Sequence, residues 1–479
     1  MNSPQKSPVA HAVSALGSLR LTVTLLGMSI FLVFAGTLAQ RHMGIWTVME
    51  QYFRCWFAWV DIRSFCPDDW HVPRAFQWGE KGRIPFGFPF PGGRLLGSVL
   101  LVNLLVSHAS RIRLVARGPR LLIGLATLAV GLLATWVVIS HVFDLDSTQK
   151  VSNPSLRVTY QLIYGGGAGA ILYVACWLLF QRKAGIVLLH AGVVILMLSE
   201  LATSLLAKEG QMSIFEGQSV NFVEDTRTVE LAIIDSSNSR DDDVYVVPKS
   251  KLEKSGTVKI DGVPFEIETN GTTFMKNGSL EPIQSGDVNP ATRGAGLRWK
   301  AVDRPESSGV DTSGSVDLPA AYIKLKGPGG EDYGTWLVSI PLTMEKGAQI
   351  VNVGGKEYRL LLRFERTYKP YSLYLYSFRF DRYAGTDTPK DYSSFIRLED
   401  AERDVSRDVR IWMNNPLRYR GDTLYQSSFD AATEKGTVLQ VVENRGWMAP
   451  YVGCMIVAIG LLGQFQLHLM QFLRKRASA

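Results

Sequence analysis

Mostly apolar blocks alternate with charged segments along this chain, and the blocks gather toward its two ends. They cover residues 21–39, 93–110, 121–143, 158–181, 184–207 and a last stretch that begins at residue 446. A helix needs about 20 mainly apolar residues to cross the hydrocarbon of a bilayer, and only the second block is marginal by that measure. We therefore expect six transmembrane helices.

The first block also has one feature of a cleaved signal peptide, since FAGTLAQ at residues 34–40 resembles a small-residue cleavage site. However, its apolar run is longer than the core of a usual signal peptide, and the charged segment before it is unusually long. We expect an uncleaved membrane anchor.

Basic residues predict how the helices are oriented. Residues 111–120 carry four arginines and no acid, residues 182–183 are Arg-Lys, and residues 474–476 are Arg-Lys-Arg. Short loops rich in lysine and arginine stay on the cytoplasmic side of a membrane. If every block crosses, both termini are cytoplasmic. The loop 41–92 and the insert 208–445 are then extracytoplasmic, on the periplasmic side of a bacterial inner membrane.

The insert 208–445 has the pattern of β-strands. In YSLYLYSFRFDRY (371–383) aromatic side chains alternate with others, which predicts a strand with one shared aromatic face. The aromatic residues of that face are Tyr374, Tyr376, Phe378 and Phe380. Turn signals within residues 414–429 predict a turn-linked strand pair. The polar runs 235–243 and 303–315 are typical of exposed loops.

These patterns predict a polytopic α-helical membrane protein with a large extracytoplasmic β-rich domain. Residues 1–207 form the membrane region with five spans, residues 208–445 form the β-rich domain, and residues 446–479 hold the sixth span and a basic tail. The β-rich domain has neither histidine nor cysteine, which excludes a Cys/His metal site, a thiol nucleophile and a Ser-His-Asp triad within it. We expect it to bind or dock partners.

The net charge of +7 fits a membrane protein better than a nucleic-acid-binding one. Most of the arginines and lysines lie beside apolar blocks, and the chain has no basic helix with interleaved aromatic residues.

The chain resembles the ResB family, the membrane component of system II cytochrome c biogenesis. Five segments carry the resemblance in the same order along the chain: GTLAQ (36–40), PFPGGRLLGSVLLVNLLVSHASRIRL (89–114), GIVLLHAGVVILMLSELATSLLAKEGQMSIFEGQ (185–218), YAGTDTPKDYSSFIRLED (383–400) and IWMNNPLRYRGDTLYQSSF (411–429). Family members commonly have four spans. The extra pair within residues 121–181 leaves open how the helices meet a partner.

The resemblance implies a function in haem delivery. It implies a partner of the CcsA/ResC type, with which this chain would carry haem b across the membrane and present it to apocytochrome c, with a thioredoxin-like thiol reductant as a further partner. This chain lacks the Cys-x-x-Cys-His sequence of a c-type cytochrome and the partner's tryptophan-rich motif; CWFAWVD (55–61) is a faint echo of that motif. We expect an accessory, non-catalytic subunit of a cytochrome c haem lyase complex. The alternative is a membrane scaffold whose β domain docks envelope partners.

Three of the seven histidines lie toward the predicted cytoplasmic ends of spans: His108, His190 and His468. Haem iron is commonly held by imidazole. With the resemblance, this implies His190 as an axial ligand to the haem iron, with His108 or a partner's histidine opposite and His468 as a further candidate. For each, a histidine that only packs between helices remains the alternative.

The surroundings expected for that haem are apolar residues for its faces and cations for its propionates. The expected apolar wall is Leu188, Leu189, Val193 and Val194, and the expected cations are Arg111, Arg113 and Lys183.

The remaining polar or reactive side chains near the membrane are less informative. Cys55 and Cys66 share the extracytoplasmic loop, where a disulfide, two free thiols or a redox role are all open. Glu200, at the outer end of the fifth span, either reaches the membrane interface or contacts a partner.

The predicted topology can be tested by cysteine labelling in intact cells with a membrane-impermeant reagent. Single cysteines introduced within residues 235–243 should label from outside, whereas cysteines within residues 111–120 should label only after the membrane is permeabilised. Equal labelling of both segments would show that the number of spans is wrong.

Overall fold

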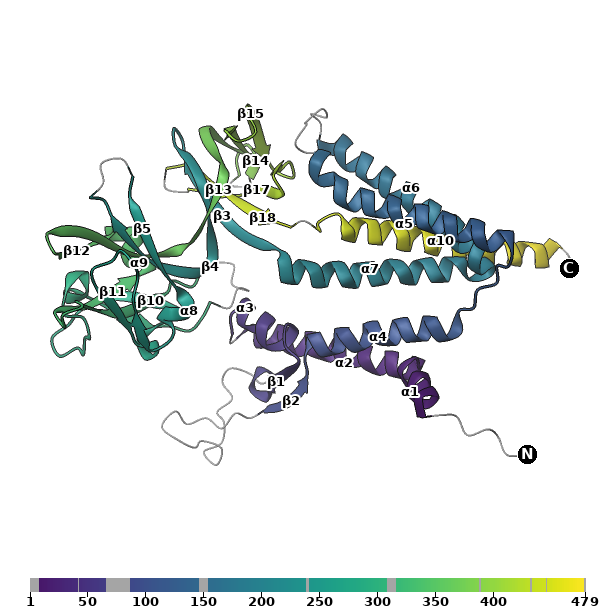
Figure 1. Ribbon diagram of the computed structural model, residues 1–479, viewed down its shortest axis with the longest axis horizontal. Helices are drawn as coiled ribbons and strands as arrows, with labels where there is room; N and C mark the ends of the chain where they lie inside the picture. The colour runs from purple at the N-terminus through teal and green to yellow at the C-terminus, as the bar shows by residue number, and fades with distance from the viewer. Residues whose placement is uncertain are drawn as a thin grey trace.

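The structure is a computed structural model that describes residues 8–41, 43–65, 87–145, 154–237, 241–307, 316–386, 389–430, 433–444 and 446–477. Figure 1 shows long helices running side by side, with a β-rich domain at one end of them. The predicted fold class, a polytopic helical membrane protein with a large β-rich domain, is confirmed.

Each apolar block forms a long helix. These are α2 (Leu19–Ala39), α4 (Gly93–Arg111), α5 (Pro119–Leu145), α6 (Pro154–Phe180), α7 (Ala184–Leu206) and α10 (Ala449–Ala477). By length and composition, five segments of the described chain could cross a membrane, and one of them, Leu162–Leu206, holds both most of α6 and all of α7. Gln181 ends α6 in a left-handed backbone conformation at φ 52° and begins a short 3-10 turn. The six-span topology itself stays a prediction.

The helices form two groups on either side of α7, with α1 (Pro8–Leu16), α2 and α4 on one side and α5, α6 and α10 on the other (Figure 1). Asn103 of α4 holds the first group together. Its side chain is buried, accepts a hydrogen bond from the hydroxyl of Thr22 at 2.6 Å, and donates to the carbonyl oxygens of Leu16 and Ser18. Away from water a polar side chain needs such partners, so this residue fixes α4 against α2.

Close packing of α7 on α10 depends on glycine. Gly185 and Gly192 of α7 face Gly460 and Gly453 of α10, and each pair is spaced seven residues, or about two turns. A Cβ on Gly192 would lie 2.9 Å from the carbonyl oxygen of Gly453, and one on Gly460 would lie 2.6 Å from the backbone nitrogen of Leu189. Small residues let helix backbones approach, which is how membrane helices gain van der Waals contact.

The β-rich domain is built around two strands that run the length of both its halves, β4 (Ser219–Asp235) and β13 (Lys356–Arg382). The other strands are β3 (Lys208–Phe215), β5 (Asp243–Pro248), β6 (Gly256–Val258), β7 (Glu266–Thr269), β8 (Gly278–Pro282), β9 (Trp299–Asp303), β10 (Ala320–Lys326), β11 (Asp332–Ser339), β12 (Gln349–Val353), β14 (Pro389–Asp400), β15 (Val405–Trp412), β16 (Leu417–Tyr419), β17 (Asp422–Phe429) and β18 (Gly436–Glu443). Short helices α8 (Lys249–Leu252) and α9 (Ile340–Lys346) complete this domain.

Two hydrophobic cores divide the domain. In one half the sheet β11-β10-β7-β6 packs on the ends of β4 and β13, with Leu231, Ile323 and Leu360 fully buried between them. In the other half the sheet continues as β15-β14-β13-β4-β3-β18-β17-β16 and curls around Leu373 and Ile396. This second half is joined directly to the membrane, because β3 follows α7 and β18 precedes α10.

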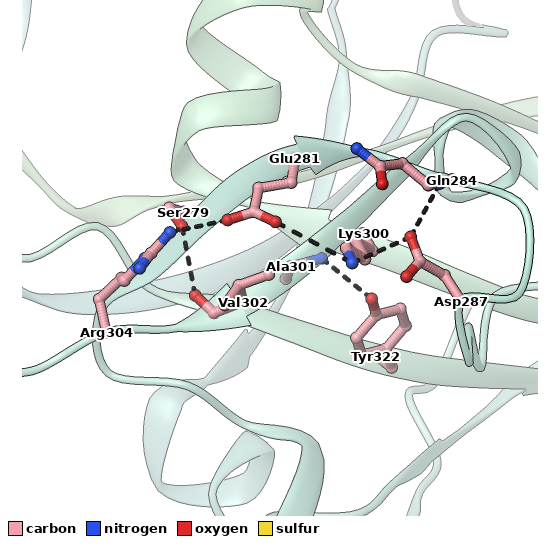
Figure 2. A network of polar contacts seen from close by, with 9 residues as sticks. All are labelled: Ser279, Glu281, Gln284, Asp287, Lys300, Ala301, Val302, Arg304 and Tyr322. Atoms are coloured by element: carbon pink, nitrogen blue, oxygen red, sulfur yellow. Dashed lines mark hydrogen bonds and ion pairs between the residues drawn. The ribbon is translucent and has the colours of Figure 1, made fainter.

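A separate hairpin, β8–β9, is fixed to the first half by polar contacts (Figure 2). The backbone N–H of Ala301 donates to the hydroxyl of Tyr322 on β10 at 3.0 Å, and Lys300 pairs with Asp287 at 2.9 Å and with Glu281 at 4.0 Å. These half-buried ion pairs of Lys300 lie within the hairpin and help to hold its register.

Residues 414–429 form the predicted strand pair. β16 and β17 are antiparallel, with Tyr419 opposite Asp422. The turn between them holds Arg420 at φ 48° and Gly421 at φ 87°, a combination typical of a tight hairpin. This prediction is confirmed.

The predicted common aromatic face of residues 371–383 is wrong. Leu375 is fully buried, Tyr376 is 40% exposed and Phe378 is 8% exposed, so the alternation changes phase within the strand. The cause is a bulge between Leu375 and Ser377 in the pairing of β13 with β14. An extra residue at a bulge turns all later side chains to the other face.

The glycine packing can be tested by adding single methyl groups. Gly460→Ala and Gly192→Ala should each destabilise the solubilised full chain by about 1–3 kcal/mol, because the added methyl group forces α7 and α10 apart. Thermal unfolding in detergent measures this effect. Gly167→Ala on α6 is the matched control, since a Cβ there meets nothing within 4 Å and alanine favours a helix. A similar melting temperature for all three variants would contradict the packing argument.

Candidate functional site

The basic segments gather at the end of the helices far from the β domain. There the C-terminal end of α10, with Arg474, Lys475 and Arg476, lies near the turn of Arg182 and Lys183 between α6 and α7 (Figure 1). The basic segment after α4 begins at the same end of the helices. The last turns of α4 and the first turns of α7 therefore share one environment, and two of the predicted site residues lie in them.

His108 of α4 and His190 of α7 face each other across the two groups of helices. Their ring centroids are 4.2 Å apart and the rings are tilted by 49°. Both side chains are half-buried. The sequence placed these residues on separate spans 82 positions apart, and the fold brings them into contact.

Hydrogen bonds define which ring nitrogen of each histidine carries its proton. Nδ1 of His108 lies 2.9 Å from the carbonyl oxygen of Leu104, and Nδ1 of His190 lies 2.7 Å from that of Ile186. A carbonyl oxygen only accepts, so each Nδ1 is the donor and each neutral ring keeps its lone pair on Nε2. Metal-ligating histidines are commonly oriented in this way.

An apolar cavity of about 310 Å³ contains both rings. Its other lining residues are Leu104, Leu105, Ala109, Ile112, Phe180, Val187, Ala191 and Val194. Of the wall expected from sequence only Val194 is among them, and Leu188 instead packs against α10. The helical repeat explains the difference, because Val187, Ala191 and Val194 share the face of His190.

Cations lie close to the histidine-bearing ends of α4 and α7. Arg111, the last residue of α4, donates to the carbonyl oxygen of Gly17 at 3.0 Å, and Lys183 donates to the carbonyl oxygen of Arg111 at 3.2 Å. Arg113 is exposed in the segment that links α4 to α5. The hydrogen bond of Lys183 joins the start of α7 to the end of α4, and the three cations give this end of the helices a positive charge.

The donor set fits a haem iron, but the two rings lie too close to flank one. An iron–nitrogen bond of about 2 Å on each side requires imidazole centroids about 6 Å apart. The observed 4.2 Å is shorter by about 2 Å. Binding by both rings therefore requires α4 and α7 to separate slightly.

His468 lies apart from this pair. It is exposed on α10, and its Nε2 accepts a hydrogen bond from the side-chain amide of Gln464 at 2.9 Å. It is not among the described residues that line the cavity. Of the other histidines, His42 and His71 lie outside the described residues, as does the side chain of His141.

A second, polar cavity of about 490 Å³ lies where α7 meets the β domain. Glu200 is exposed there, as are Lys208 and Glu209, and the half-buried Arg227 also lines the cavity. The carboxylate of Glu200 therefore lies at the end of α7 next to the β domain, and a contact with a partner stays a prediction.

The surroundings of Cys55 favour an unreactive thiol. Its Sγ donates to the carbonyl oxygen of Gln51 at 2.9 Å. Burial raises the pKa of this thiol, so less of it is the reactive thiolate at neutral pH. Cys66 lies outside the described residues, and a bridge between the two stays untested.

The family comparison concerns the C-terminal part of the β domain. The model of the ResB-like family matches residues 342–438, from α9 into β18. In this region the chain is similar to the ResB-like family. Protein NrfI of Wolinella succinogenes is 38% identical over 93 residues, which are 19% of this chain and 10% of the length of NrfI.

The ResB-like region lies at the opposite end of the helices from the histidine pair. It includes the hairpin β16–β17 and the first residues of β18. The depth of the histidines in the spans marks them in the sequence. Trp46 and Arg227, which contact each other between the helices and the β domain, were not predicted from the sequence. They are 181 positions apart, and no local pattern marks either residue.

Proposed function

We propose that this ResB-like chain is a component of a system II cytochrome c biogenesis complex and handles haem as cargo. The observation that carries the proposal is the pair His108 and His190, in contact across two helix groups within an apolar cavity. Both rings keep a lone pair on Nε2, as iron ligation needs. The similarity of residues 342–438 to the ResB-like family supports the same assignment.

In this proposal the chain's own residues supply ligands, walls and charge. The Nε2 atoms of His190 and His108 would take the two axial positions of haem b once α4 and α7 part by about 2 Å. Val187, Ala191 and Val194 would contact the porphyrin face. Arg111, Arg113 and Lys183, at the same end of α4 and α7 as the histidines, would pair with the propionates.

The basic end of the helices supports an inner-membrane location with both termini in the cytoplasm and the β domain in the periplasm. Haem would then enter from the side where it is made. The chain has no Cys-x-x-Cys-His and no tryptophan-rich presenting motif. Attachment to apocytochrome c is therefore assigned to a CcsA/ResC-type partner, with this chain as an accessory subunit and a thioredoxin-like protein keeping the client's thiols reduced.

A scaffold function is the second candidate. The family match covers only residues of the β domain, which supports a docking role for that domain with envelope proteins. In that case His108 and His190 would only pack, each bonded to its own helix.

The two candidates differ in the effect of His190→Ala. Alanine favours a helix, so the variant should insert and accumulate. If His190 is a ligand, haem in the purified complex should fall at least about tenfold, the loss expected for a ligand or its immediate support. Cytochrome c maturation should fall with it, and added imidazole should restore part of the Soret band.

His468→Ala is the matched control, because that residue is an exposed histidine of another span outside the cavity. It should keep normal haem content and normal maturation. Unchanged haem and maturation in His190→Ala and His108→Ala would reject the ligand assignment and favour the scaffold.

A further inference from the structure

The helix group α1–α2–α4 contacts the rest of the chain at both of its ends. At the inner end are the histidine pair and the hydrogen bond of Lys183 with Arg111. At the outer end the short helix α3 (Ile45–Val48), which follows α2, contacts the β domain. The separation of His108 from His190 therefore depends on contacts at both ends.

The outer contact has two parts. The guanidinium of Arg227 on β4 lies over the indole ring of Trp46. The hydroxyl of Thr47 donates to the carboxylate of Glu306, which also pairs with Lys276 at 2.8 Å. Gly44 lies so near the backbone of Ser307 that a Cβ would come within 2.9 Å of its carbonyl oxygen. The N-terminal group is thus seated on the β domain through aromatic, polar and backbone contacts.

A displacement of α3 also displaces α2 and α4, because α3 continues into a segment that packs on both helices. Its continuation, the π-helix Met49–Phe53, places the ring of Phe53 against Gly36 of α2 and its backbone against Gly93, the first residue of α4. The backbone N–H of Arg94 donates to the carbonyl oxygen of Cys55 at 3.2 Å. The outer ends of α2 and α4 therefore move with α3.

The β domain is equally tied to α7 and α10. The side chain of Asn444, just after β18, donates to the hydroxyl of Thr203 on α7 at 3.3 Å. The guanidinium of Arg418 lies 3.6 Å from the centre of the Trp447 ring, just before α10. The β domain thus bridges the two helix groups around the polar cavity of about 490 Å³.

A small tilt of α4 about its end next to the β domain displaces His108, near the other end of that helix, by a few ångströms. His108 lies 15 residues after Gly93, which is about 22 Å along α4. A tilt of about 5° about the outer end moves the imidazole by about 2 Å. That is the difference between the present ring contact and the spacing that two axial ligands require.

We propose that the contacts Trp46–Arg227 and Thr47–Glu306 form an outer latch that sets the separation of His108 and His190. Its residues are positioning residues, 37 or more positions from either histidine in sequence. Only the consequence for haem rests on the proposed function. The mechanical coupling of the outer latch to the histidine pair can be tested without any haem.

The test measures a distance between the two helix groups in the full-length protein, reconstituted in lipid. Spin labels are attached at Ser110→Cys on α4 and Phe465→Cys on α10, both exposed positions, after Cys55, Cys66, Cys176 and Cys454 are replaced by serine or alanine. The distribution of distances is recorded by pulsed electron paramagnetic resonance. Trp46→Ala with Glu306→Gln should shift or broaden the distribution by about 2 Å or more, since the tilt of α4 is no longer held.

Two further variants separate the outer latch from general damage. Arg227→Gln should reproduce the broadening, and Trp46→Phe should largely restore the narrow distribution because a ring face remains for the guanidinium. Arg410→Gln removes a guanidinium stacked on Trp412 within the β domain, at 4.8 Å, and should change nothing. An unchanged distribution in the folded Trp46→Ala, Glu306→Gln protein would overturn the proposal.

Haem content of the same proteins distinguishes this proposal from the function it refines. A broadened distance with no haem in the parent protein or its partner complex supports the outer latch and rejects haem handling. Haem in the parent protein, together with an unchanged distance in the latch variants, supports haem handling and rejects the outer latch. If both hold, the latch variants should lose haem and shift its Soret maximum, while Arg410→Gln keeps both.

Discussion

Polar side chains within a membrane must find their partners without water, and the helical part of this chain is organised by that requirement. Thr127 and Thr135 return hydrogen bonds to carbonyl oxygens one turn earlier, so each polar group is satisfied within its own helix. Asn103 instead reaches across to α2 and fixes a helix pair. His108 and His190 satisfy Nδ1 on their own helices, and the lone pair of each neutral ring stays on Nε2.

The two parts of the molecule are stabilised by different forces. The β domain buries large apolar side chains from water, so the hydrophobic effect drives its two cores. Among the helices the hydrophobic effect contributes little, because lipid is as apolar as the side chains. Close backbone contact at Gly192 and Gly460 stabilises this part instead. Where the two parts meet, charged residues such as Glu200 and Lys369 line a polar cavity. Neither a hydrophobic core nor glycine packing between helices stabilises that boundary. The boundary is therefore the place where the parts can shift relative to each other.

Much of the fold follows from local sequence. The apolar blocks predict α2, α4, α5, α6, α7 and α10 within a few residues, and the turn at Gly421 gives the β16–β17 hairpin. The predictions that failed depend on contacts between residues far apart in the sequence. The bulge after Leu375 arises from pairing with a distant strand, so alternation alone misplaced Tyr376. In the same way, depth along each span placed the histidines at a common level, but only helix packing decided that Val187 and not Leu188 shares their cavity.

Under the proposed function, the histidine pair belongs to a site that must release what it binds, and its position between two helix groups suits that task. Had both ligands stood on α7 and α10, the glycine contacts between those helices would hold them at one separation. Instead His108 belongs to the group fixed by Asn103, and His190 to the group fixed by glycine packing. Each group can stay internally rigid while the distance between them changes. Under the proposed function, a ligand held between two such groups is bound or released by one small tilt, with neither core disrupted.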